Sequence, residues 1–241
     1  MAFGPCGFKS RSRHLEPLLA IAEDLERRDA RAAEALLEVE RLQHEIDELR
    51  THVAKTAAFL RELPAAAAAR QEEEHAADEA LAHAVTALRD AEAEFERLAE
   101  KRSDSARLAA ARAAQHARDA VDDATLWLER VREERARLER EGTERRGEAE
   151  RLERRAAELA GHARLAHDVP PPGPGLDGAL EWAAQARGEL LVAHAALATE
   201  REKLVREASE LVASVLGEPL AATSVAGIRS RLAHALETPS P

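Results

Sequence analysis

The sequence has little of the material from which compact domains are built. Only 2% of its 241 residues are aromatic, and Cys6 is its single cysteine. The scarcity of large side chains argues against a thick globular core, and one cysteine excludes an internal disulfide. Glycine is absent over residues 8–141, and proline occurs at Pro17 and Pro64 and then not before Pro170. Because both of the strongest helix breakers are missing over residues 65–141, we expect extended helices.

Long apolar runs are also missing. No stretch approaches the ~20 apolar residues that span a bilayer, and Lys9, Arg11, Arg13 and Glu16 interrupt what could be an apolar signal core. The formal net charge of −11 argues against general affinity for phosphate backbones, which rests on lysine and arginine. We therefore expect a cytoplasmic protein without a transmembrane segment.

What is present in abundance is helix-forming residues, with 34% of the chain charged. Apolar residues recur in alternating steps of three and four between 18 and 63, a spacing that keeps one stripe on one side of a helix. Arg28 and Thr56 interrupt this stripe. We predict that it is an interaction seam, whose members are Leu18, Ile21, Leu25, Val39, Leu42, Ile46, Leu49, Val53, Leu60 and Leu63.

Prolines, glycines and changes of phase divide the chain. The pattern predicts a flexible tail at 1–10, long coiled-coil helices over 11–168, a Pro/Gly linker at 169–178, a third long helix at 179–216, and a short C-terminal helix and tail at 217–241. Within the long helices we expect weak points near 101–105 and 141–148. At Pro64 the chain either reverses in a hairpin or continues with a kink.

The third long helix carries a seam of its own. Four leucines recur one heptad apart, and Leu191, Ala198, Val205 and Val212 accompany them, which widens the stripe and favours packing inside a bundle. These seam leucines are Leu190, Leu197, Leu204 and Leu211. At the edge of the stripe lies a row made of Arg187, His194 and Arg201. The row could meet an acidic partner face, but we favour solvated side chains.

These lengths suggest an arrangement. If the chain reverses at Pro64, the first helix lies against residues 65–110; if it reverses again at the linker, the third helix covers residues 127–168. Trp127 would then lie near Val215. The predicted fold class is all-α: an elongated antiparallel coiled-coil or helical-bundle rod of long helices with a short C-terminal helix.

Few residues form a chemical constellation. Glu72 and His75, with Glu79 and His83 on the same helix face, have metal-ligand spacing, but the second Glu-x-x-His pair of di-iron bundles is missing. The glycines of 173–178 spell G-x-G-x-x-G, yet they follow three prolines instead of a strand. We therefore predict no catalytic residue, no cofactor and no functional metal site.

The expected function is that of a non-enzymatic coiled-coil scaffold or oligomerisation protein, whose partner is a second copy or another helical protein. One alternative is an accessory protein of DNA or chromosome machinery, because such coiled coils resemble the arms of chromosome-maintenance ATPases. Another is a coat of a hydrophobic or lipid surface, similar in composition to alanine-rich phasins.

The C-terminal segment carries the DNA alternative. Residues 216–219, Leu-Gly-Glu-Pro, followed by 228–232, Ile-Arg-Ser-Arg-Leu, resemble the helix-turn-helix of bacterial sigma factors. The resemblance implies DNA contact through Arg229 and Arg231. The interval between the two parts exceeds the usual turn of 3–4 residues, so we favour a helix that caps the bundle, with Val225, Ile228, Leu232 and Ala235 pointing inward.

Overall fold

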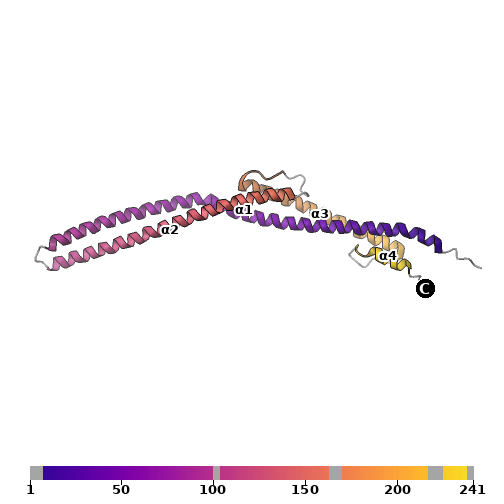
Figure 1. Cartoon of the computed structure of the whole chain (residues 1–241), viewed down its shortest axis with the longest axis horizontal. Helices are drawn as coiled ribbons and strands as arrows, with labels where there is room; N and C mark the ends of the chain where they lie inside the picture. Colours follow the sequence, from indigo (N-terminus) through magenta and orange to yellow (C-terminus); the bar gives the residue numbers. More distant parts are fainter. Residues whose placement is uncertain (1–7, 100–103, 163–169, 217–224, 238–241) are drawn as a thin grey trace, which may run out of the picture. The chain divides into compact units, whose positions relative to one another are not determined.

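The computed structural model describes residues 8–99, 104–162, 170–216 and 225–237. These ranges contain α-helices and no strand, and the three long helices pack against each other (Figure 1). The helices are α1 (Phe8–Ala99), α2 (Asp104–His162), α3 (Gly175–Leu216) and α4 (Ile228–Glu237). The predicted all-α helical bundle is confirmed.

The helix α1 does not end at Pro64, so of the two alternatives at this position the structure excludes the reversal. A proline removes one backbone hydrogen bond and strains the preceding turn, which costs roughly 3 kcal/mol inside a helix. Contacts with α2 on both sides offset this cost: Leu63 packs on Gly142, and Arg70 pairs with Glu134 at 2.8 Å. The chain instead changes direction between Ala99, where α1 ends, and Asp104, where α2 begins. Most of the weak point predicted at 101–105 lies outside the described residues.

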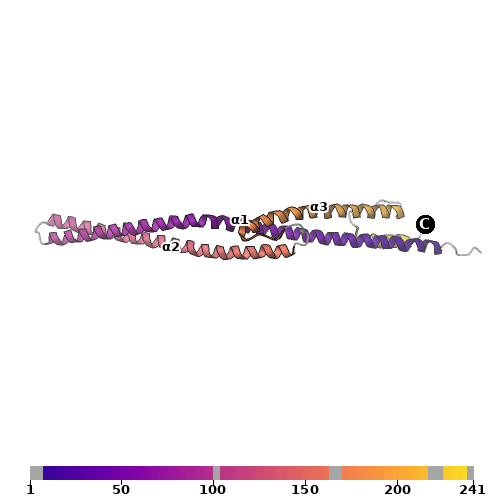
Figure 2. The same ribbon diagram turned by 90° about the horizontal axis from the view of Figure 1, so that it is seen from above.

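Residues 52–154 form a compact unit, which we call the hairpin unit. Its α1 and α2 segments run antiparallel, because Leu63 meets Gly142 while Glu92 meets Arg118, and the two helices lie side by side in both ribbon views (Figures 1 and 2). The buried residues of its shared seam are mostly small. They are Val53, Thr56, Ala57, Leu63, Ala77, Ala110, Ala114, Leu128, Val131, Gly142 and Ala149.

The predicted weak point at 141–148 lies inside α2, which continues through it to His162. Gly142 is buried, and a Cβ atom there would approach the Leu63 Cδ2 atom to 2.7 Å. The missing side chain therefore lets α1 and α2 approach closely at this level. Gly147 is exposed and has no such neighbour within 4 Å among the described residues.

The remaining residues, 1–51 and 155–241, form a second compact unit, which we call the three-partner unit. Its part of α1 contacts α3 in antiparallel fashion: Asp47 pairs with Arg187 at 2.7 Å, and Asp29 with Arg201 at 2.9 Å. Segments of α2 and α4 contact the same part of α1 through the pairs Glu45–Arg155 and Glu23–Arg229. The first part of α1 is thus the helix to which the other three attach.

This arrangement corrects the expected position of the third helix. Val215 of α3 packs against a cluster that contains Ala22 and Leu25 of α1. Trp127 belongs to the hairpin unit, where it is 39% exposed. The expectation failed because it required a reversal at Pro64.

The helix α3 begins at Gly175, earlier than the predicted 179, and Asp177 lies within its first turn. Gly175 has a φ of 79°, which favours glycine. A Cβ atom on Gly178 would lie 2.4 Å from the backbone of Gly173, so the first turn of α3 lies directly against Gly173. The G-x-G-x-x-G spacing therefore has a packing explanation in this chain.

Candidate helix–helix interaction site

The structure places most of the predicted seam residues between helices. Nine are buried: Leu25, Val39, Leu42, Ile46, Leu49, Val53, Leu63, Leu190 and Leu204. Four are partly buried: Leu18, Leu60, Leu197 and Leu211. Ile21 is 49% exposed and is therefore not covered by the helices of its own chain. The buried residues contact other helices of the same chain, which shows that one chain can close its own seams.

The seam is displaced by one residue near the start of α1. Ala22 and Asp29, seven residues apart, are buried where the spacing predicted Ile21 and Arg28. The reason is that α1 packs here against α3 and also near α4, so its buried face is wider and differently centred. Asp29 is 8% exposed, and Arg201 of α3 donates a hydrogen bond from Nε to its Oδ1 atom at 2.9 Å.

The basic row of α3 meets an acidic face, contrary to the solvated row that we favoured. Besides the Arg187 and Arg201 pairs with Asp47 and Asp29, His194 Nε2 lies 3.5 Å from Glu40 Oε1. Exposed pairs of this kind contribute at most about 1 kcal/mol each. Their spacing nevertheless fixes the register of α3 on α1, because a shift by one turn would misalign all of them.

The C-terminal helix closes an apolar cluster. Val225, Ile228 and Leu232 are fully buried, and they share this cluster with residues of α1 and α3. The α1 and α3 members are Ala22, Leu25, Leu204, Ala208 and Val212. The expected capping role of this helix therefore rests on direct packing, since a ten-residue helix is marginal in isolation.

The beginning of α4 faces carboxylates of α1. The backbone N–H of Arg229 donates to Glu26 Oε1 at 3.0 Å, and the Arg229 side chain lies 3.6 Å from Glu23. A carboxylate near a helix N-terminus interacts favourably with the helix dipole. A recognition helix would present this same end to a DNA groove, so these contacts weigh against the helix-turn-helix resemblance.

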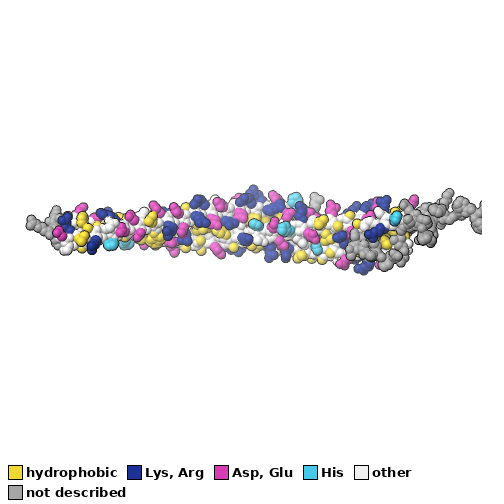
Figure 3. Space-filling model, turned by 90° about the horizontal axis from the view of Figure 1, so that it is seen from below, with side chains coloured by type: hydrophobic (Ala, Val, Ile, Leu, Met, Phe, Trp, Pro, Cys, Tyr) yellow, Lys and Arg dark blue, Asp and Glu magenta, His cyan; other side chains and the backbone are white. Residues whose placement is uncertain are grey.

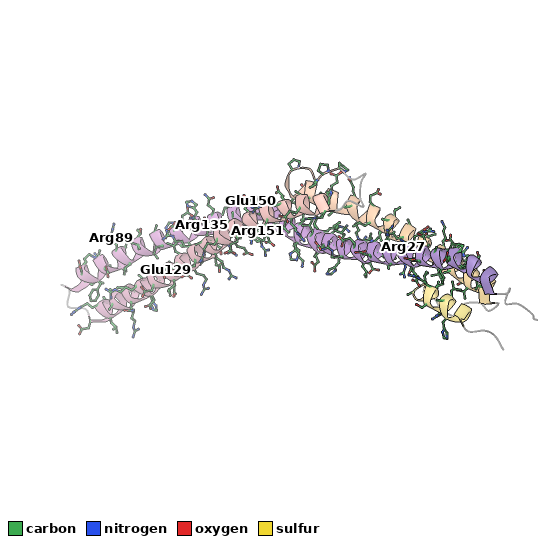
Figure 4. The ribbon with its side chains drawn as sticks, turned by 45° about the vertical axis from the view of Figure 1, so that its right-hand side comes forward. Arg27, Arg89, Glu129, Arg135, Glu150 and Arg151 are labelled. Carbon is green, nitrogen blue, oxygen red and sulfur yellow. The ribbon has the colours of Figure 1, made fainter. Side chains whose placement is uncertain are left out.

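A charged cluster interrupts the seam of the hairpin unit. Glu74, whose side chain is 14% exposed, accepts hydrogen bonds from Arg132 Nε at 3.0 Å and from Arg135, which is labelled in Figure 4. Arg132 also reaches Asp78 at 3.2 Å. Acidic side chains of α1 are therefore partly neutralised by α2 within the same chain.

Thr56 is a second polar residue in the seam. Its side chain is 1% exposed, and its hydroxyl has no hydrogen-bond partner among the described residues. Thr56→Val keeps the shape and removes a buried unsatisfied group, so we expect the free energy of unfolding to rise by about 1–2 kcal/mol in chemical denaturation. Thr51→Val is the matched control, because the exposed Thr51 hydroxyl bonds to Asp47 O at 2.9 Å. Equal effects of both substitutions would contradict the idea that the gain in stability comes from removing a buried, unsatisfied hydroxyl.

The candidate metal-ligating residues lie on the surface. His75 and Glu79 pair at 3.3 Å with side chains 77% and 64% exposed, and His83 is exposed as well. Within the described ranges no three histidine, cysteine or acidic residues are placed to hold a metal ion. Cys6 lies outside the described residues.

The resolved pKa shifts come from exposed ion pairs. A hydrogen bond from Arg41 lowers the pKa of the Glu38 carboxyl, and the same contact raises the pKa of Arg41. Glu94 likewise raises the pKa of Arg97. Glu38 therefore contributes stability above the pKa of an unfolded glutamate, and this contribution disappears as the pH falls through its lower folded value.

The surface offers intermixed charges and open hollows. Figure 3 shows basic and acidic side chains interspersed with hydrophobic ones on the face that it presents. A hollow of about 680 Å³ lies open along the outer side of α2. Its lining is Ala136, Glu139, Arg140, Thr143, Glu144, Gly147 and Arg151. None of the described helices is both long and apolar enough to cross a membrane.

Comparisons with known proteins return no relative. No protein-family model, curated protein sequence or solved structure matches the chain. The class that the fold defines is thus an all-α helical bundle of long helices.

Proposed function

We propose that the protein is a non-enzymatic helical scaffold that acts through helix–helix association, with a second copy of itself as the first partner to test. The proposal rests on one observation: the buried apolar side chains and the inter-helix ion pairs of this chain hold helices against one another. The apolar seams, the row of ion pairs between α1 and α3, and the Glu74 cluster all serve one helix against another. The mechanism is geometric: apolar burial supplies the attachment, and charge selects the register.

The buried seams also determine what association can use. Because Leu42 and Leu49 are already covered within the chain, a partner must bind through faces that remain exposed. We place this function in the cytoplasm, where a chain with one cysteine needs no disulfide.

The test is the mass of the full chain in solution. We expect light scattering after size-exclusion chromatography to give at least twice the chain mass of 26.3 kDa at high concentration, and a lower mean mass on dilution. A folded chain that stays monomeric up to roughly 200 µM, well above the micromolar range of weak specific complexes, would contradict self-association.

A further inference from the structure

The two flanks of the hairpin unit differ in chemistry. On one side of the seam, which we call the charged flank, Glu92 of α1 pairs with Arg118 of α2 at 2.8 Å, and Asp78 pairs with Arg132 at 3.2 Å. Val85 lies midway between the two acids, seven residues from each. This flank is closed by ion pairs within the chain.

The opposite side of the seam is an apolar flank. The heptad positions across the seam from the charged flank hold Ala80 and Ala87 in α1 and Ala113, Ala120 and Trp127 in α2. Four of these five residues are exposed, and Ala80 is partly buried. The flank ends where charges return, at Glu134 beside Arg70 and at Glu94 beside Arg97.

The antiparallel register places the apolar-flank residues of α1 beside those of α2. Residues that face each other on the charged flank, such as Asp78 with Arg132, fix this register. By the same alignment Ala80 lies at the level of Trp127, and Ala87 at the level of Ala120. A tryptophan that is 39% exposed beside small residues resembles the anchor of a protein interface, because large aromatic side chains dominate such contacts.

The size of the apolar flank suits a pair of hairpins. Its residues span 80–87 in α1 and 113–127 in α2, or roughly 12 and 22 Å, and two adjacent helices present a face about 20 Å wide. Two such faces bury on the order of 800 Å², which lies in the range of weak, transient interfaces. This area fits a dimer that dissociates on dilution.

Charges at the outer edge of the apolar flank favour a second copy as the occupant. His83 and Asp90 in α1, and His116 and Asp123 in α2, are exposed and lie three residues beyond the alanines of the flank. In both helices the histidine precedes the aspartate by seven residues, and the helices run antiparallel. When two copies meet face to face, the two-fold axis lies in the plane of this face and runs either along or across the helices. For both directions of the axis, the histidines of one copy lie opposite the aspartates of the other.

We propose that the apolar flank of the hairpin unit, centred on Ala87 and Ala120 and anchored by Trp127, is the face through which two copies of this chain associate into a four-helix contact. This inference rests on the proposed self-association and names its surface. The alanines allow close approach of the helices, and the histidines and aspartates at the edge set the alignment.

The test compares two double variants of the full chain by sedimentation equilibrium. Ala87→Glu with Ala120→Glu puts charges into the apolar flank, and we expect the dimer dissociation constant to rise about 100-fold or more because these charges lose their water. Val85→Glu with Thr125→Glu adds the same charges on the charged flank. We expect that control to stay within about threefold of the wild type, as is usual for residues outside an interface.

Three results would overturn the assignment, and they have different consequences. If the wild type dimerises and the apolar-flank variant dimerises equally well, the face is wrong but self-association stands. Equal weakening by the control variant also removes the assignment, because the effect is then general repulsion. A wild type that remains monomeric contradicts both proposals. Circular dichroism confirms folding, and Trp127→Gln, which adds no charge, is a second variant expected to weaken the dimer.

Discussion

Replacing Leu42 and Leu49 together by aspartate is expected to abolish folding of the first part of α1. Both leucines are buried, with exposed fractions of 2% and 4%. A charge at such a position costs on the order of 4–5 kcal/mol or more, and two of them approach the whole stability of an ordinary domain, about 5–15 kcal/mol. Loss of helical circular dichroism at 25 °C and a broad or absent thermal transition are the expected observations.

The matched control makes the same chemical change at exposed positions of the same helix. Ile21 and Leu37 are 49% and 67% exposed, so Ile21→Asp with Leu37→Asp should lower stability by only about 1 kcal/mol, mainly through helix propensity. If this variant unfolds as completely as the first, Ile21 is buried as the regular apolar spacing predicts, and its exposure in the structure is contradicted.

Shortening Leu232 to alanine should detach the C-terminal helix. Leu232 is fully buried against residues of α1 and α3, and a cavity at such a site costs about 2–4 kcal/mol. Because α4 has ten residues, it has little helical stability of its own. Hydrogen exchange should therefore lose protection throughout α4, with smaller losses in α3 near Ala208.

Leu191→Ala is the control for this local effect. Leu191 is 51% exposed on α3, so its truncation leaves no cavity and should change amide protection only slightly. Uniform loss of protection in the Leu232 variant, extending through the hairpin unit, would show that α4 is not a locally stabilised element.

The regular spacing of apolar residues predicted the all-α class and most of the buried seam. Between Val39 and Val53 the predicted and buried positions coincide, because steps of three and four fit a helix packed against others on one face. Nearer the start of α1 the rule failed at Ile21. There α1 contacts both α3 and α4, and local spacing in one helix cannot report how many partners surround it.

The other wrong expectations, on Pro64, the basic row of α3 and Trp127, depended on contacts between residues far apart in the sequence. Pro64 is a strong helix breaker in isolation, but the α2 residues that contact Leu63 and Arg70 on either side of it are far away in the sequence. The row containing Arg187 and Arg201 looked solvated because its acidic partners belong to α1. We expected Trp127 to lie near Val215 because the expected topology began with a reversal at Pro64, which α1 does not make.

Attachment of α3 to α1 also has a consequence for synthesis on the ribosome. The hydrogen bond between Arg28 and Glu200 joins residues that are 172 positions apart. At roughly 5–20 residues per second, the first part of α1 emerges about 10–30 s before the helix that covers it has been made. Its apolar stripe must spend that interval uncovered, so nascent chains on neighbouring ribosomes have time to meet before each closes on itself.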